Sequence, residues 1–321
     1  MKLIAADLSN IEGRALAFIG HEEWKLEAFR AYDRGEGADL YNITATSIIG
    51  GDPFKVAKKD RNVFGKVPDL ALGYAGGVGA LQQFAKAYRV EMADHWPTIE
   101  ENIDAIHVAK AQENYGLWGA PKAEEMEISE IEWTASETVK LAWRARHPAT
   151  VKLWQEVEDA ARNAIKHKGK TFKAGRHLLL SVRSHAGHPY LLVKLPSGRY
   201  LTYFHPRVEQ KSGERGSTIT YMGSYRRTPT SPPIWGKVTT YGGKMVENIC
   251  QSFSRDVMMY NMQPAEDAGY GITLTVHDEM ITESENGTDE ELSAIMATVP
   301  PWAEGLPLAA AGFTATRYKK D

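Results

Sequence analysis

The chain has 321 residues, of which 43% are apolar and 25% charged, and its formal net charge is −3 at pH 7. This length can bury the core of one or two domains. The charge balance excludes a strongly basic protein, so nucleic acid would have to be bound by Lys and Arg side chains gathered on one face. The single cysteine, Cys250, excludes a disulfide framework and a cysteine-rich zinc site, and it is typical of a reducing, cytoplasmic setting. No apolar run is long enough to cross a membrane.

The first half of the sequence predicts mainly helices. Residues 3–6 read as a short buried strand that ends at Asp7, after which Ser9 or Asn10 can cap a helix through Phe18. Residues 114–130 are rich in Gly, Pro and Glu and are expected to form an insertion or an exposed loop. Further helices are predicted over residues 24–32, 38–49, 66–74, 99–111 and 151–165.

The second half mixes strands with one long helix. Residues 190–204 predict a hairpin around Pro196-Ser197-Gly198, whereas residues 207–236 predict no definite element. A helix is predicted over 244–262, and strands over 272–276, 280–282 and 313–318. Because helices dominate and the small sheet is built from distant segments, the predicted fold class is α+β.

Two carboxylates stand out by their positions in these elements. Asp7 ends the first strand, and Asp278 lies at the turn between the strands at 272–276 and 280–282. Brought together on one sheet, they would form a hard oxygen site suited to Mg²⁺, which can assist phosphoryl transfer. Taken singly, each aspartate is more often a turn or cap residue, because aspartates are common at strand ends.

A helical face offers a second set of side chains. Lys66, Leu70 and Tyr74 follow one another at intervals of four residues, which places them along one side of an α-helix. Such a face could present a cation to a triphosphate and an aromatic ring to a base. On its own, the same spacing also describes a solvated lysine beside an ordinary apolar stripe.

Together these segments resemble the motifs of family A, the DNA polymerase I-like DNA polymerases. The run from Asp7 to Arg14, D-L-S-N-I-E-G-R, is similar to motif A, D-Y-S-Q-I-E-L-R, and V-H-D-E at 276–279 matches motif C. Residues 66–74 resemble motif B, with its Lys and its Tyr eight residues later. Asn248 with Gln251 resembles the helix before motif C, which touches the primer–template minor groove. The motifs occur in the family order, and the intervening sequence resembles bacteriophage or prophage members.

The resemblance implies two Mg²⁺ ions as cofactors, and primer–template DNA and dNTPs as partners. Asp7 and Asp278 would be the catalytic metal ligands, with the Leu8 carbonyl as a third oxygen and Glu279 as a supporting carboxylate. The dNTP would meet Lys66 at its triphosphate, Tyr74 by stacking, and Leu70 and Glu12 at its sugar, where Glu12 should help to exclude a 2′-hydroxyl. The residues implied in primer and template contacts are Gln251, His277 and Asn248.

The resemblance also implies a right-hand polymerase. The palm would comprise residues 1–30 and 241–321, with a small antiparallel sheet, and mainly helical fingers with insertions would occupy 31–240. Motif A lies so near Met1 that a thumb and an exonuclease are not expected in this chain, and a second polypeptide could supply them. The reaction would be template-directed DNA synthesis; the alternative is a weakly active or non-catalytic nucleic-acid-binding subunit of a split polymerase. A nuclease using the same aspartates would leave Lys66 and Tyr74 without a role.

The chain departs from the family pattern at several positions. Leu8 and Leu70 replace residues that are usually aromatic. The family arginine four residues before the lysine falls on Asn62, so Arg61 would lie about 100° away from it on an α-helix, which argues against Arg61 as a triphosphate ligand. Pro68 is tolerated only in a first helical turn, which favours a helix that begins near Val67.

Two other features carry weaker indications. A basic run comprises residues 166–170 with Lys173, Arg176 and Arg183; it is either a solvated loop or a surface that follows phosphates. The tryptophans at positions 133, 143 and 154 are expected to lie in the core rather than to stack on bases.

Overall fold

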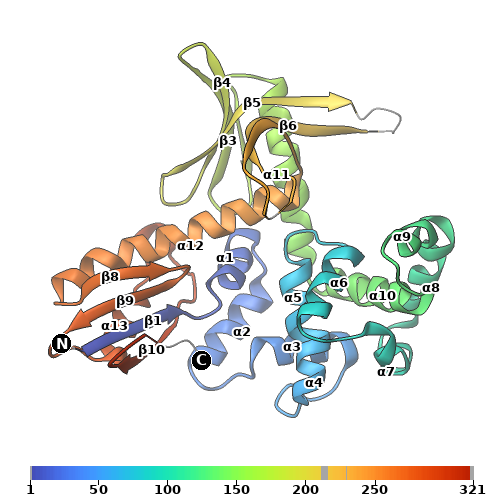
Figure 1. Ribbon diagram of the computed structural model, residues 1–321, viewed down its shortest axis with the longest axis horizontal. Helices are drawn as coiled ribbons and strands as arrows, with labels where there is room; N and C mark the ends of the chain where they lie inside the picture. Colours follow the sequence, from blue (N-terminus) through green and yellow to red (C-terminus); the bar gives the residue numbers. More distant parts are fainter. Residues whose placement is uncertain (1, 211–215, 229, 319–321) are drawn as a thin grey trace. The chain divides into compact units, whose positions relative to one another are not determined.

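The computed structural model describes residues 2–210, 216–228 and 230–318 (Figure 1). It divides into two compact units: Met1–Leu26 with Leu153–Asp321, and Glu27–Lys152. We call these unit 1 and unit 2. This division differs from the expected one, because residues 153–240 belong with the two chain ends and not with the helical segment. None of the described helices combines the length and apolar character that a membrane crossing needs.

Unit 1 contains both sheets of the described chain and the helices that cover them. Helices α2 (Glu23–Asp33) and α11 (Pro148–Lys166) run across the two boundaries between the units. The other helical elements of unit 1 are α1 (Ile11–Gly20), α12 (Gly242–Asp267), α13 (Asp289–Met296) and η4 (Pro301–Ala303). Its strands are β1 (Lys2–Leu8), β2 (Thr171–Ala174), β3 (Leu178–His185), β4 (His188–Lys194), β5 (Tyr200–Gln210), β6 (Ser217–Tyr225), β7 (Ile234–Thr240), β8 (Gly271–Val276), β9 (Glu279–Ser284) and β10 (Ala310–Ala315).

The first sheet, sheet A, has four antiparallel strands in the order β10-β1-β9-β8. The N-terminal strand β1 therefore lies inside the sheet, between two strands from the C-terminal part of the chain (Figure 1). Ile4 and Leu8 on β1 are fully buried, which explains why this short segment is so apolar. Sheet A confirms the α+β class and the small antiparallel sheet that the sequence predicts.

Helix α12 forms the main packing partner of α1 in unit 1. Its fully buried residues Ile249, Phe253 and Val257 are four residues apart and so form one apolar stripe. The Phe253 ring stacks on Phe18 of α1 at a centroid distance of 5.6 Å and meets Trp302 edge-on at 5.4 Å. These contacts hold the predicted primer helix against α1, which carries the second half of motif A.

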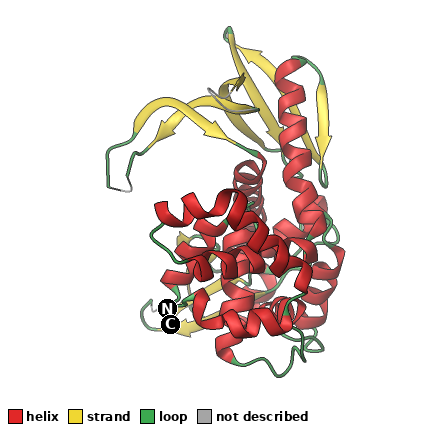
Figure 2. Ribbon diagram, turned by 90° about the vertical axis from the view of Figure 1, so that its right-hand side faces the viewer, coloured by secondary structure: helices red, strands yellow, loops and turns green. Residues whose placement is uncertain are grey.

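The second sheet, sheet B, is a six-stranded antiparallel meander in the order β2-β3-β4-β5-β6-β7. The sequence predicted only its β4–β5 hairpin, whereas the described part of residues 207–236 supplies the end of β5, β6 and the start of β7. A register shift between Phe204 and Arg207 marks a β-bulge in β5, and bulges bend and twist a sheet. The strong curvature of the sheet is visible in Figure 2.

Unit 2 is helical throughout its described secondary structure. Its elements are α3 (Leu40–Ile49), α4 (Lys58–Asp60), η1 (Arg61–Lys66), α5 (Val67–Leu72), α6 (Val78–Ala87), η2 (Met92–His95), α7 (Trp96–Asn102), α8 (Ala105–Asn114), η3 (Tyr115–Gly119), α9 (Ala120–Glu125) and α10 (Glu130–Arg146). Helix α10 is its centre: Trp133 and Trp143 are 0% and 1% exposed, and Trp154 in unit 1 is also buried, so the predicted core role of the three tryptophans is confirmed.

Several element predictions need correction. The expected helix at 99–111 is two helices, because Asp104 caps the start of α8 by accepting from the Ile106 N–H at 3.0 Å. The expected loop at 114–130 is mostly helical, in η3 and α9, and its Tyr115 packs against the Trp133 ring. Asn10 precedes α1 in a left-handed conformation, but its side chain makes no capping hydrogen bond. The last strand ends at Ala315, before the predicted end at residue 318.

Candidate functional site

Sheet A places the two sequence-predicted catalytic carboxylates at neighbouring positions, Asp7 on β1 and Asp278 in the turn just before the adjacent strand β9. In the pairing of β1 with β9, Asp7 lies opposite Glu279, the residue after Asp278. The Leu8 N–H donates to the Asp278 carbonyl at 3.2 Å, so motifs A and C are joined directly by their backbones. Asp7 and Asp278 are each half-buried, whereas the side chain of Leu8, the residue after Asp7, is fully buried.

The turn that carries Asp278 has an unusual backbone. Val276 pairs with Glu279, which leaves His277 and Asp278 as a two-residue hairpin loop. His277 has a φ of 56°, a region that non-glycine residues rarely occupy and that costs conformational free energy. Such strain persists only where the surrounding structure enforces it, and here the β1 and β9 pairing does so. The exposed His277 side chain therefore projects from a fixed position beside Asp278.

Glu279 has a partner that the motif comparison did not identify. It is 5% exposed, and its Oε2 accepts a hydrogen bond from the Tyr318 hydroxyl at 2.8 Å. This hydrogen bond raises the pKa of Tyr318, with smaller contributions from burial and from the negative charges of Glu279 and Asp7. Tyr318 therefore remains a neutral donor at ordinary pH and holds the Glu279 carboxylate in place, on the residue that pairs with Asp7.

The segment after Asp7 is fixed by a buried arginine. Arg14 of α1 is 1% exposed, and its Nε donates to the Ser9 carbonyl at 2.7 Å. Arg14 thus holds the turn between β1 and α1. Glu12 lies in the first turn of α1 and is exposed.

Helix α12 brings two of the three predicted primer and template contacts, Asn248 and Gln251, onto one face. Asn248 and Gln251 line the same pocket of about 310 Å³, together with residues of β5 and β6. The Asn248 Nδ2 donates to the Tyr203 hydroxyl at 3.1 Å, while Gln251 is exposed. Tyr203 is a residue that the sequence did not single out; burial raises its pKa to about 12, so it stays protonated.

The motif B residues lie in unit 2, on a helix whose form changes along its length. Residues 61–66 form a π-turn, η1, in which the Val67 N–H bonds to the Asn62 carbonyl, and α-helix begins at Val67 with Pro68 in its first turn. Only the α-helical form begins at Val67: the helical backbone runs without a break from Lys58, so the expected helix start near Val67 was wrong and Lys66 lies within the helix. Helix α5 ends at Leu72, so Tyr74 lies in the following turn and not on the helix. Lys66 Nζ lies 4.9 Å from the centroid of the Tyr88 ring, and Leu70 is 37% exposed.

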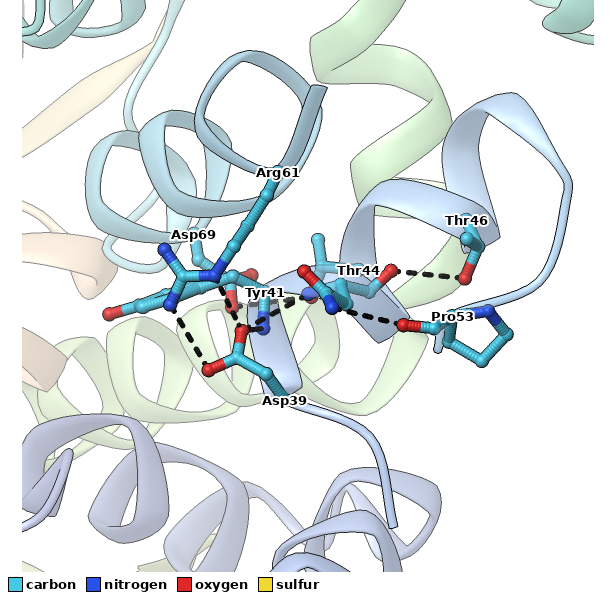
Figure 3. Close-up of polar contacts among 8 residues, drawn as sticks. Asp39, Tyr41, Thr44, Thr46, Pro53, Arg61 and Asp69 are labelled. Carbon is cyan, nitrogen blue, oxygen red and sulfur yellow. Dashed lines mark hydrogen bonds and ion pairs between the residues drawn. The ribbon is translucent and has the colours of Figure 1, made fainter. Parts of the chain in front are cut away.

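The π-turn changes the expectation for Arg61. Hydrogen bonds in a π-turn span five residues, so residues five apart face similar directions, as residues four apart do in an α-helix. Arg61 and Lys66 are five residues apart, so in this turn their side chains point in similar directions. The predicted 100° displacement of Arg61 from the family arginine position assumed an α-helix and was wrong. Arg61 Nε and Nη2 donate to the two Asp39 carboxylate oxygens, each at 3.0 Å, and its guanidinium lies 4.9 Å from the Tyr41 ring (Figure 3).

A second aspartate, Asp69, makes hydrogen bonds that hold α5, the helix that follows η1. Asp69 on α5 accepts hydrogen bonds from Thr44 of α3 at 3.3 Å and from the Trp143 indole at 2.8 Å. His147 stacks on Trp143 with 3.9 Å between centroids, and its Nε2 is 3.8 Å from Asp69. Figure 3 shows Tyr41 and Thr44 of α3, with Asp39 just before the helix, facing Arg61 and Asp69. Helix α3 and its cap residue Asp39 therefore contact this helical segment at Arg61 and at Asp69.

The structure thus brings the predicted residues together in two groups. Asp7, Leu8, Glu12, Asn248, Gln251, His277 and Asp278 belong to unit 1, and Lys66, Leu70 and Tyr74 belong to unit 2. The described residues contain no cluster of three or more His, Cys, Asp or Glu side chains suited to a metal ion. Two carboxylates and one carbonyl fit Mg²⁺, since this ion commonly takes one or two protein carboxylates and completes its shell with water and substrate phosphates.

Comparisons with known proteins agree with this arrangement. No protein-family model matches the chain. Over 98% of its length the chain is 34% identical to a DNA polymerase of Bacillus phage SP02, and over 32% of its length it is 32% identical to DNA polymerase I of Streptococcus pneumoniae. A solved structure of the POL domain of Pol1 from M. smegmatis, in complex with DNA primer–template and dNTP, covers 98% of the chain with a TM-score of 0.53 and 16% identity.

The fold is therefore that of a polymerase domain. The chain belongs to the family A (DNA polymerase I-like) DNA polymerases of the bacteriophage type. It spans 41% of the length of the phage polymerase and 40% of the mycobacterial chain. In both relatives the matched part thus belongs to a longer polypeptide, and neither comparison supports the expected second polypeptide.

Proposed function

We propose that this chain is the catalytic part of a template-directed DNA polymerase, which joins a primer 3′-hydroxyl to the α-phosphate of a dNTP and releases pyrophosphate. The pairing of β1 with β9 carries the proposal, because it joins Leu8 to Asp278 through their backbones. Asp7, Asp278 and the Leu8 carbonyl would hold two Mg²⁺ ions. When bound, the ions would assist deprotonation of the attacking hydroxyl and balance charge on the leaving group.

The other side chains would position the substrates. Lys66 would supply positive charge to the triphosphate, and Tyr74 would stack at the insertion site. Leu70 and Glu12 would contact the sugar from opposite sides. Gln251, His277 and Asn248 would hold the primer end and the minor groove. In this proposal unit 1 corresponds to the palm, enlarged by sheet B, and unit 2 corresponds to the fingers.

The test is primer extension with the purified chain, Mg²⁺ and dNTPs. Asp7→Asn and Asp278→Asn should each slow extension by about a thousandfold, since a catalytic metal supplies several kcal/mol of transition-state stabilisation. DNA affinity should change little, because it depends on phosphate contacts made elsewhere. The matched control is Glu285→Gln, an exposed carboxylate after β9 that should extend like the wild type. Normal extension by either aspartate variant would refute the metal-site assignment.

A further inference from the structure

The two faces of sheet B differ in character. Antiparallel partners share a face, so the register defines each face across the strands. One face carries the buried residues Leu180 of β3, Val193 of β4 and Tyr203 of β5, and it meets α12 through the Tyr203–Asn248 hydrogen bond. The opposite face, which we call the outer face, carries Arg183, Tyr190, Phe204, Met222 and Lys237 in successive pairs from β3 to β7.

Aromatic rings form a continuous group on the outer face. Phe204 lies 5.1 Å from Tyr190 and 6.2 Å from Trp235, centroid to centroid. The β5 bulge gives His205 a φ of 49° and brings it beside this group, where its Nε2 is 3.0 Å from Nδ1 of His188. Trp235 is 62% exposed. A tryptophan that served only to stabilise the sheet would be expected to bury far more of its ring against neighbouring side chains.

The outer face also carries positive charge. Its described strand residues include one carboxylate, Glu209, which pairs with Lys237 at 2.9 Å. The basic side chains on this face are Lys173, Arg183, Lys194, Arg207 and Lys237. In a chain with a formal net charge of −3, this is a local concentration of cations. It includes Lys173 and Arg183 of the basic run, whereas Arg176 donates to Glu23 and the Phe18 carbonyl instead.

We propose that the outer face of sheet B binds a single-stranded polynucleotide. Exposed aromatic rings can stack on bases only where those bases are unpaired, and interleaved cations follow the phosphates of the same strand. A duplex keeps its bases stacked on one another and offers Trp235 no partner. This binding needs neither metal nor dNTP, so it goes beyond the proposed polymerisation and does not depend on it.

The first test measures the aromatic contribution. Fluorescence anisotropy of a short labelled oligothymidylate with the full chain, without Mg²⁺ or dNTP, gives the affinity. Trp235→Ala should weaken binding about fivefold or more, the effect of losing one stacked base, and Trp235→Phe should recover most of it. Phe54→Ala removes a side chain that is 69% exposed in unit 2 and serves as the matched control. Unchanged affinity in Trp235→Ala, or an equal loss in Phe54→Ala, would overturn the proposal.

The second test measures the phosphate contribution. Arg207→Gln should reduce the slope of log affinity against log salt by about 0.7, the value for one phosphate contact on a single strand. Lys86→Gln, which removes an exposed lysine from α6 of unit 2, should leave the slope unchanged. Repeating the measurement with an oligouridylate of the same length shows whether the outer face binds RNA or DNA more tightly. Tighter binding of a duplex of equal length, with the same dependence on Trp235, would overturn the single-strand assignment.

Discussion

Leu70 illustrates how one side chain can set substrate preference. It lies on α5 with 37% of its side chain exposed, one residue after the anchored Asp69, so its direction is well defined. In the family that the chain belongs to, a tyrosine at this position makes dideoxynucleotides good substrates, because its hydroxyl replaces the missing 3′-hydroxyl. Leucine has no hydrogen-bonding group, so the protein cannot compensate for that loss.

We therefore expect the wild-type chain to discriminate strongly against dideoxynucleotides. Leu70→Tyr should reduce the discrimination about two- to tenfold, which corresponds to one hydrogen bond of roughly 0.5–1.5 kcal/mol. Competition between a dideoxynucleotide and the matching dNTP gives the ratio directly, and Leu70→Phe controls for the aromatic ring. Equal incorporation of both substrates by the wild type would contradict the assignment of Leu70 to the sugar pocket.

Glu12 should act on the other side of the sugar. It is exposed at the start of α1, whose first turn is held by the bond from Arg14 to the Ser9 carbonyl. Glu12→Ala should relax the exclusion of ribonucleotides, because it removes the side chain that would meet a 2′-hydroxyl, and it should leave dideoxynucleotide selection unchanged. Incorporation ratios for ribonucleotides and dNTPs check this expectation. Unchanged ribonucleotide exclusion would remove Glu12 from the site.

At the scale of elements, the π-turn η1 depends on close contact with α3. A Cβ on Gly65 would lie 2.0 Å from the Tyr41 carbonyl oxygen, so only glycine lets the two backbones approach. Burial, with the nearby charge of Asp69, raises the pKa of Tyr41 to about 12, so its ring remains a neutral support beneath Arg61. Asp39 links the two elements further, since it caps α3 and binds Arg61 at once.

Gly65→Ala should therefore destabilise unit 2 by about 1–3 kcal/mol, as overpacking does, and should raise the KM for dNTP by displacing Lys66. Chemical denaturation and single-nucleotide incorporation measure the two effects. Gly116→Ala is a matched control, because Gly116 also lies in a π-turn but a Cβ there would meet nothing within 4 Å. A Gly65→Ala protein with unchanged stability and KM would show that the contact with α3 is not needed.

At the scale of the whole molecule, DNA binding has to work against a formal net charge of −3. Long-range attraction is then weak, and affinity depends on local groups of Lys and Arg. We expect distributive synthesis by the isolated chain, with products that shorten further as salt is raised. Extension in the presence of excess unlabelled primer–template measures the nucleotides added per binding event. Long products under these conditions at raised salt would contradict the expectation.

The sequence by itself determined the local elements and the chemistry that they carry. The motif residues are contiguous or regularly spaced, so the strand before Asp7, the α12 stripe and the hairpin around Asp278 could be predicted from short-range patterns. The roles of Tyr318 and Arg14 could not be predicted in this way. Their hydrogen bonds to Glu279 and Ser9 form only in the folded chain, and no sequence pattern indicates them.

Only the tertiary structure decided how these elements combine. The insertion of β1 between β9 and β10 joins opposite ends of the chain, and no local pattern encodes such a pairing. The meander of sheet B and its exposed aromatic face depend on register between strands, which sequence alternation alone left undefined at residues 207–236. The π-turn was missed because helical spacing rules assume the α form, and the close approach of Gly65 to α3 is a tertiary contact that local spacing does not reveal.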